Sequence, residues 1–376
     1  MAEISSTPPL TRRSVADAHA LIRPHIHATP VVTSRALSEL ASTPRSRNNN
    51  DGDGAARPRL RLWFKCENLQ RVGAFKVRGA FHALERLKRE PGWAEGGGRE
   101  RGVVTHSSES PLTPPTGNHA QALALAAREN NIPAHIVMPT VSMPAKIAAT
   151  KGYGARVYLS GSTSAEREAL AAQVMTDTGG ARLIPPYDHP DIILGQGTVG
   201  LELQEQAAQL MATTDPYGTA SSYSSSSSSS SSPLASPPRL DAIMTPCGGG
   251  GMLSGADDAK RGFERGQRVT SVSSATIADG LRTPLGEWPW RIIYERRLVS
   301  GMYSVTDDDI RAALRLVWER MKLVVEPSAV VGLAVALYNE DFRAMVEREA
   351  GERGWDLGLV LSGGNIGLDA VPGMLL

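Results

Sequence analysis

The sequence predicts an α/β fold built on mainly parallel sheets. Apolar runs of strand length alternate with segments of helical periodicity between residues 60 and 177, and two further strands are expected near residues 241 and 357. Strands that alternate with helices form βαβ units, whose sheets are parallel and covered by helices on both faces. The chain has 376 residues, a length typical of two or three domains.

Each expected element follows from a local pattern. Two short amphipathic helices at 14–24 and 34–41 begin near Ser or Thr residues that can cap them. The segment 74–89 repeats apolar residues at helical spacing, and a helix rich in Ala and Leu is expected from Asn118 to Glu129. Further helices are expected at 145–151 and 165–177, and strands at 60–66, 102–105, 134–138, 155–159, 241–245 and 357–361.

Three polar stretches interrupt this alternation. Residues 42–58 show no periodicity, residues 109–116 contain three prolines, and residues 214–238 include nine consecutive serines from 224 to 232. Such compositions bury too little apolar surface to offset the entropy lost on ordering, so solvated loops are expected. We interpret 214–238 as a disordered Ser/Pro-rich linker, with a phosphorylated segment as the alternative.

Composition narrows the class of protein. The formal net charge is +1 and the basic residues are scattered, so neither a nucleic-acid partner nor attraction to anionic membranes is expected. No stretch approaches the ~18 apolar residues of a membrane span. Cys66 and Cys247 are the only cysteines, and residues 1–9 lack the features of a secretory signal. We therefore expect a cytoplasmic protein.

Lys76 and the four glycines Gly248, Gly249, Gly250 and Gly251, here called the tetraglycine turn, carry the most chemical information. A lysine amine partly desolvated by apolar neighbours can form a Schiff base with a carbonyl cofactor. A turn without side chains after a strand lets backbone N–H groups close on a phosphate. Taken singly, the lysine could be solvated and the glycines a hinge. Together they indicate pyridoxal 5'-phosphate.

Several segments, in this order, resemble the fold-type II pyridoxal phosphate enzymes, and within them the serine racemases and serine/threonine dehydratases. They are 64–70 (FKCENLQ), 73–80 (GAFKVRGA), 117–122 (GNHAQA), 195–198 (GQGT), 246–255 (PCGGGGMLSG), 276–280 (TIADG), 317–322 (VWERMK) and 361–365 (LSGGN). The resemblance implies two three-layer αβα domains of the tryptophan synthase beta-like fold. The large, cofactor-binding domain is expected to comprise 1–99 and 187–376, and the small domain 100–186.

The resemblance also implies a role for each site residue. Lys76 is expected to form the Schiff base, with Phe75 and Met252 beside the cofactor and the tetraglycine turn on its phosphate. Asn118 is expected to hydrogen-bond the phenolic oxygen, although it could instead cap a helix. Ser362 is expected to face the pyridine nitrogen, although it could be a plain turn residue. His119 and Cys247 are interpreted as structural.

These features predict a serine racemase-like enzyme that interconverts L- and D-serine, eliminates water from serine to give pyruvate and ammonia, or does both. The amine of Lys76 takes the Cα proton from one face. Racemisation needs a second acid on the opposite face, whereas elimination needs only departure of the β-hydroxyl. The alternatives are a catabolic threonine dehydratase and a catalytically impaired cofactor-binding protein, and the resemblance suggests a homodimer.

The sequence departs from the family at three places. Thr116 stands where the racemases carry the opposite-face serine, and Ser108 precedes eight apparently inserted residues. A helix–strand unit of about two dozen residues is missing after Gly255. Ala256 and Asp258 match two ligands of the racemase Mg²⁺ or Ca²⁺ site, while the matching Glu is absent. At the family's nucleotide-effector positions the chain carries Arg71 and Val72 instead of Lys and Thr.

Overall fold

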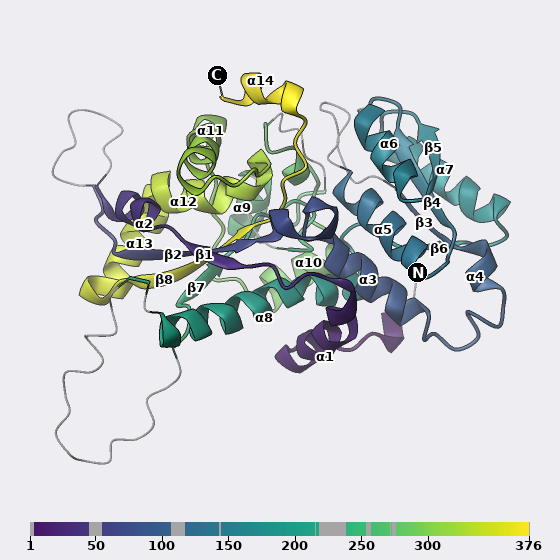
Figure 1. Cartoon of the computed structure of the whole chain (residues 1–376), viewed down its shortest axis with the longest axis horizontal. Coiled ribbons are helices and arrows are strands. Elements are labelled where there is room, and N and C mark those ends of the chain that lie inside the picture. Colours follow the sequence, from purple (N-terminus) through teal and green to yellow (C-terminus); the bar gives the residue numbers. More distant parts are fainter. Residues whose placement is uncertain are drawn as a thin grey trace, which may run out of the picture.

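The computed structural model contains two four-stranded sheets with helices packed on both faces of each (Figure 1). It describes residues 4–44, 55–106, 117–142, 144–214, 216–217, 238–252, 257–270, 272 and 276–375. The predicted α/β class with mostly parallel sheets is confirmed. The assignment of residue ranges to a large and a small domain stays a prediction.

The first sheet pairs strands from opposite ends of the chain. Its order is β1 (Val31–Thr33), β2 (Leu60–Cys66), β8 (Trp355–Leu361) and β7 (Ala242–Met244). β8 runs parallel to β2 and β7, whereas β1 is antiparallel to β2. Leu60 lies opposite Trp355 and Cys66 opposite Leu361, so β2 and β8 end together at their carboxyl ends.

Alternate side chains of β2 enter different cores, because successive residues of a strand point to opposite faces. Leu62 and Phe64 pack with α2 (Arg35–Ser42), α11 (Asp307–Leu316) and α12 (Val331–Tyr338). Trp63 packs on the other face with Val199 and Leu203 of α8 (Pro190–Thr213). This sheet is therefore the middle layer of an αβα sandwich.

The second sheet is parallel throughout. Its order is β5 (Arg156–Ser160), β4 (Ala134–Pro139), β3 (Val103–His106) and β6 (Arg182–Leu183). Val103 and Ile136 face a core shared with α3 (Lys76–Leu87) and α5 (Asn118–Glu129). Val104 and Val137 face α7 (Ser164–Asp177) on the other side. The second sheet repeats the three-layer arrangement.

The remaining helices surround these two cores. They are α1 (Arg12–Ile22), α4 (Gly98–Arg101), α6 (Pro144–Gly152), α9 (Asp257–Arg265), α10 (Glu287–Trp290), α13 (Glu340–Ala350) and α14 (Val371–Leu375). Strand β2 and helix α5 have the predicted bounds, and the other predicted elements lie within two residues of theirs. No described helix has both the length and the apolar run needed to cross a bilayer.

Sequence periodicity did not predict α8 or α12. Helix α12 is apolar all round and all its residues except Tyr338 are buried, so it shows no polar face from which a period could be recognised. Helix α8 is buried along its first half between β2, α1 and α3. In both helices packing on several sides removes the amphipathic signal on which the sequence argument relied.

The polar interruptions lie largely outside the described residues. These exclude 45–54 of the first interruption, all of the second at 109–116, and residues 215 and 218–237 of the third. Tyr217, inside the predicted linker, packs edge-on against Trp63 with ring centroids 5.5 Å apart and donates a hydrogen bond to the Leu62 carbonyl. The expectation of a solvated stretch from 214 onward is therefore wrong for Tyr217, because its ring is held against β2.

β7 lies at an edge of the first sheet. Ile243 of β7 is 40% exposed, and among the described residues no further strand pairs with this edge. Exposed edges are templates for unwanted pairing. The loss of a helix–strand unit after Gly255 stays a prediction.

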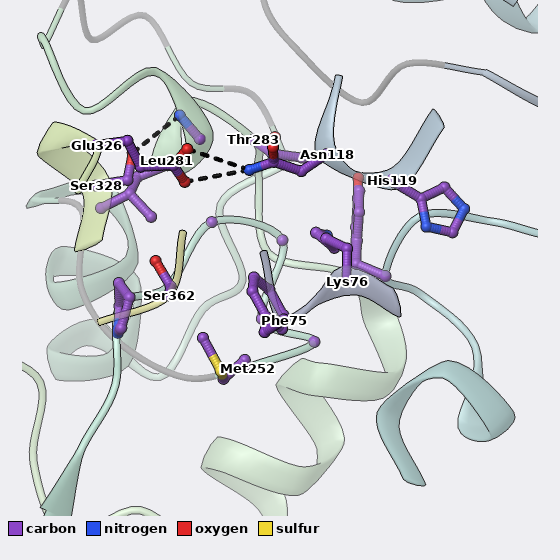
Figure 2. A pocket seen from close by; sticks show the side chains of 17 residues that line it. Phe75, Lys76, Asn118, His119, Met252, Leu281, Thr283, Glu326, Ser328 and Ser362 are labelled. Carbon is purple, nitrogen blue, oxygen red and sulfur yellow. Dashed lines mark hydrogen bonds between the residues drawn. The ribbon is translucent and has the colours of Figure 1, made fainter. Parts of the chain in front are cut away.

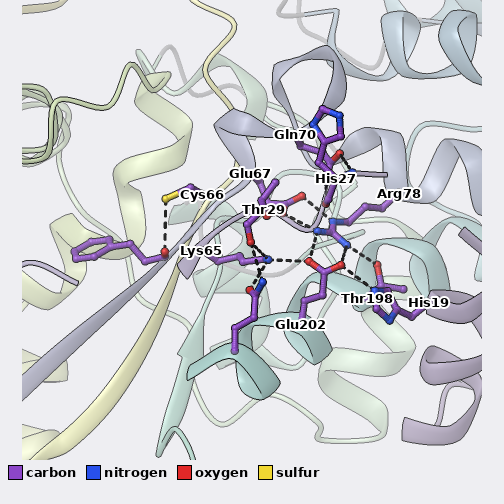
Figure 3. Close-up of polar contacts among 12 residues, drawn as sticks. His19, His27, Thr29, Lys65, Cys66, Glu67, Gln70, Arg78, Thr198 and Glu202 are labelled. Atoms are coloured by element: carbon purple, nitrogen blue, oxygen red, sulfur yellow. Dashed lines mark hydrogen bonds and ion pairs between the residues drawn. The ribbon is translucent and has the colours of Figure 1, made fainter. Parts of the chain in front are cut away.

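A buried cluster of charges joins β2, α3 and α8 (Figure 3). Arg78 donates two hydrogen bonds to Glu67, at 2.7 and 2.8 Å, and others to Glu202, at 2.8 and 3.1 Å. Lys65 donates to Glu202 at 2.7 Å and to Gln206 at 2.8 Å. Lys65, Glu67 and Arg78 are fully buried. Two cations and two carboxylates thus compensate each other, and they fix the first turn of α3.

Glu202 is the shared member of this cluster. Burial raises its pKa, but hydrogen bonds from His19 and Arg78 and the charge of Lys65 lower it well below the ordinary value. Glu202 is therefore ionised in the folded protein. Its contribution to stability is present above about pH 4.3 and is lost as the pH falls toward its folded-state pKa.

We predict that Glu202→Gln lowers the free energy of unfolding by about 3–5 kcal/mol at pH 7, because Lys65 and Arg78 then share one buried carboxylate. The variant should also lose less stability than the parent when acidified below pH 4. Urea unfolding at both pH values measures this. Glu205→Gln, on an exposed position of the same helix, should change stability by less than about 0.5 kcal/mol. Equal effects of the two substitutions contradict the prediction.

Candidate active site

One pocket gathers residues that follow the carboxyl ends of β2, β3, β7 and β8 (Figure 2). Ligands of open α/β sheets bind at such strand ends. The lining includes every predicted cofactor-binding residue: Phe75, Lys76, Asn118, Gly248, Gly249, Gly250, Gly251, Met252 and Ser362. It also includes His119, Tyr187, Pro246, Gly280, Leu281, Thr283, Glu326 and Ser328. The structure therefore brings Lys76 and the tetraglycine turn together.

Lys76 is the first residue of α3, and its amine lies inside this pocket. Nζ donates a hydrogen bond to the Pro186 carbonyl at 2.9 Å and lies 5.3 Å from the centre of the Phe75 ring. The Phe75 backbone N–H donates to the Ser362 carbonyl at 3.0 Å. This bond ties the segment before Lys76 to the loop after β8, so the amine and Ser362 share one wall.

The tetraglycine turn is closely packed against its neighbours. A Cβ on Gly249 would lie 2.3 Å from the Tyr187 ring, and one on Gly248 would lie 2.5 Å from the Gly280 carbonyl oxygen. Contacts this short are not tolerated, so these positions require glycine. Within the described residues, no backbone N–H of the turn donates a hydrogen bond to protein. These donors suit a phosphate.

Asn118 is the first residue of α5, and Gly117 precedes it as the N-cap with φ 63°. The Asn118 side chain therefore does not cap the helix. Its Nδ2 donates to the two carboxylate oxygens of Glu326, at 3.1 and 3.3 Å, and its Oδ1 accepts from Asn365 Nδ2 at 2.6 Å. Asn118 and Glu326 are buried. Figure 2 shows both side chains directed toward one another across the pocket.

Two ionisable side chains of the lining are held neutral. Burial and the nearby charge of Lys76 lower the pKa of His119 to about 3, and its Nε2 faces the Ile184 carbonyl at 3.3 Å. Burial and the charge of Asp188 raise the pKa of Tyr187 to about 12. Neither group changes charge between pH 5 and 9.

Ser362 is buried directly after β8. Among the described residues its hydroxyl has no hydrogen-bond partner, so it can donate to or accept from a ligand. An amine, a backbone anion cradle, an amide and a hydroxyl thus surround one space. These donors match an aldehyde, a phosphate, a ring oxygen and a ring nitrogen, and the residues present fit pyridoxal phosphate.

The structure does not describe the side chains of the other predicted site residues. Ser108, Thr116 and Ala256 lie outside the described residues, and Asp258 is placed only as a backbone position in α9. In the part of the chain that the structure describes, no three His, Cys, Asp or Glu side chains are grouped to hold a metal. The predicted opposite-face acid and cation site stay predictions.

Glu326 and Tyr187 are pocket residues that the sequence argument missed. Glu326 is the one charged residue in the apolar run 323–337, and a lone carboxylate in such a run is a signal that could have identified it. Tyr187 gave no comparable signal. It lies in an irregular segment, and its place beside Gly249 depends on a contact between residues far apart in sequence.

Comparison with known proteins agrees with this geometry. A family described as pyridoxal-phosphate dependent enzyme matches residues 22–351. The L-threo-3-hydroxyaspartate ammonia-lyase of Saccharomyces cerevisiae is 37% identical, over 95% of this chain and 93% of its own. The serine racemase of Arabidopsis thaliana is 36% identical, over 95% of this chain and 94% of its own. The crystal structure of serine racemase from Dictyostelium discoideum has a TM-score of 0.71 at 33% identity and covers 96% of this chain and 99% of that one.

We predict that Gly249→Ala weakens the binding of pyridoxal phosphate at least about tenfold, because the added methyl group displaces Tyr187 or the turn. Gly200→Ala is the matched control, since a Cβ there meets nothing within 4 Å. Equilibrium titration of the cofactor-free proteins measures the dissociation constants, and thermal unfolding checks that both variants fold. Unchanged affinity in folded Gly249→Ala contradicts the assignment of the turn to the phosphate.

Proposed function

Because the chain belongs to the family of pyridoxal-phosphate dependent enzymes, we propose that it racemises or deaminates a small hydroxy amino acid, with serine as the first candidate. Relatives that share a third or more of its residues are named serine racemase and hydroxyaspartate ammonia-lyase. Both reactions begin with removal of the Cα proton of an amino acid. Threonine is the nearest alternative substrate, and threonine deaminase is among the similar structures.

The shared pocket of Lys76 and the tetraglycine turn supports this proposal most strongly. Lys76 holds the cofactor covalently and, once displaced by substrate, moves the Cα proton on its own face. The turn binds the phosphate, Asn118 faces the ring oxygen, and Phe75 and Met252 border the ring. Pyridoxal phosphate, when bound, supplies an electron sink for the charge that develops at Cα.

Ser362 favours racemisation or elimination over reactions with long-lived carbanions. It would face the ring nitrogen with a neutral hydroxyl, which would not force that nitrogen to be protonated as a carboxylate would. The ring is then a moderate electron sink. Such a sink would suit proton return at Cα or loss of a β-hydroxyl.

The balance between racemisation and elimination depends on the opposite face of the substrate. We assign the second acid to Thr116, with Ser108 as the alternative hydroxyl. A threonine is stiffer at χ1 than a serine, so elimination should exceed racemisation. The carbonyl of Ala256 and the carboxylate of Asp258 are the proposed ligands of a weak Mg²⁺ or Ca²⁺ site. A nucleotide effector near Arg71 is less favoured.

The proposed enzyme is a cytoplasmic homodimer. Cys66 and Cys247 are both buried and neither forms a disulfide, which suits a reducing compartment. A catalytically impaired cofactor-binding protein is the second candidate, and the open edge of β7 is the observation that favours it.

Lys76→Ala should abolish the visible absorbance of the bound cofactor, because no other amine is assigned to hold it. Absorbance spectra of the purified parent and variant after addition of pyridoxal phosphate measure this. Lys88→Ala, at the end of the same helix, should leave the spectrum unchanged. A parent protein without a visible band overturns the proposal.

Chiral analysis of serine, with pyruvate scored in parallel, distinguishes the activities. We expect more pyruvate than D-serine, and we expect Thr116→Ser to raise the yield of D-serine relative to pyruvate. The same assays on a chain that carries a relative's helix–strand unit after Gly255 test the second candidate. Activity confined to the restored chain supports an impaired protein, and activity in neither chain despite a visible band makes cofactor binding the sole function.

A further inference from the structure

Four polar groups form a continuous chain of hydrogen bonds beside the pocket. Asn365 Nδ2 donates to the Val72 carbonyl at 2.7 Å and to Asn118 Oδ1 at 2.6 Å. Asn118 Nδ2 in turn donates to Glu326. The four residues come from the loop before Lys76, the loop after β8, the start of α5 and the segment after α11.

Both ends of this chain have a fixed polarity. The Val72 carbonyl can only accept a hydrogen bond, so the Asn365 group that faces it must be the NH₂ group. The same NH₂ group then faces the Asn118 oxygen. At the other end, the Glu326 carboxylate can only accept, so it selects the Asn118 NH₂ group. A reversal of either amide places oxygen against oxygen, so both amide orientations are determined.

We infer that Asn365 is a positioning residue that holds Asn118 as a hydrogen-bond donor toward the ring oxygen of the cofactor, an inference that rests on the proposed function. The Asn118 NH₂ group has two N–H bonds, and Glu326 needs one of them. The other can meet a ring oxygen in the pocket that Asn118 lines. A donor there stabilises the cofactor form that carries negative charge on this oxygen.

Asn365 is itself held firmly. The Gly364 N–H donates to the Gly73 carbonyl at 2.9 Å, and Ala74 forms an antiparallel bridge with Gly363. Gly73 has φ 68°, and a Cβ there would lie 2.7 Å from Asn365 Oδ1. Gly73 therefore leaves the space that the Asn365 amide occupies. The segment that leads into Lys76 therefore also holds Asn365, the partner of Asn118.

The test uses the full-length protein loaded with pyridoxal phosphate and the variants Asn365→Asp and Asn365→Ala. An aspartate accepts from Asn118 instead of donating to it, which reverses the Asn118 amide. We expect Asn365→Asp to shift bound cofactor from its long-wavelength to its short-wavelength absorbance band at pH 7. The dissociation constant of the cofactor should rise about tenfold. Asn365→Ala should cause a smaller change in the same direction, because it frees the amide without reversing it.

Two controls separate positioning from a loss of fold. Asn131→Asp makes the same chemical change at an exposed site and should leave the bands as in the parent. In an Asn118→Ala background, Asn365→Asp should produce no further change in the band ratio, because Asn365 acts through Asn118. A further change in the band ratio when Asn365→Asp is added to Asn118→Ala overturns the inference.

The outcomes also separate this inference from the proposed function. A parent that binds cofactor, together with Asn365 variants that keep its band ratio and affinity, overturns the role of Asn365 alone. A parent without cofactor binding overturns both. If thermal unfolding shows that Asn365→Asp does not fold, Asn365→Ala decides: a shifted band ratio supports the inference, and parental bands overturn it.

Discussion

The pairing of Arg78 with Glu67 and Glu202 is the constraint on which the rest of the structure depends. Arg78 lies two residues after Lys76 in the first turn of α3, and its guanidinium reaches carboxylates next to β2 and on α8. Apolar residues of similar volume can match the stability of a buried ion pair. They cannot match its geometry, because a guanidinium with two carboxylates is satisfied in one orientation only. The cluster therefore determines the direction in which α3 begins, and with it the position of the amine.

Helix α3 connects both halves of the molecule. Its apolar residues Val77 and Phe81 pack into the core beneath the second sheet, while Arg78 forms an ion pair with Glu67, which directly follows β2 of the first sheet. The residues of the pocket come from the ends of strands in both sheets, and α3 starts where those ends approach each other. The arrangement of the pocket thus follows from the burial of a single helix between two sandwiches.

Much of the fold and part of the site could be predicted from local sequence. β2 and α5 have clear periodicity and clear ends, so their bounds were predicted correctly. Lys76 and the tetraglycine turn were predicted to share a pocket because each has a chemical signature of its own. Helices α8 and α12 were missed because burial on all sides removes any polar face. The role of Asn365 depends on its contact with Asn118, which lies 247 residues away. No local pattern encodes such contacts.

The close approach of Gly73 to Asn365 has a consequence for how this protein can diverge. A side chain at position 73 collides with the amide at position 365, and a smaller residue at 365 leaves the Val72 carbonyl without its donor. The two sites can therefore change only together, and each intermediate along that route is impaired. Lineages that retain this loop should keep both residues or replace both, so substitutions at 73 and 365 should be correlated across homologues.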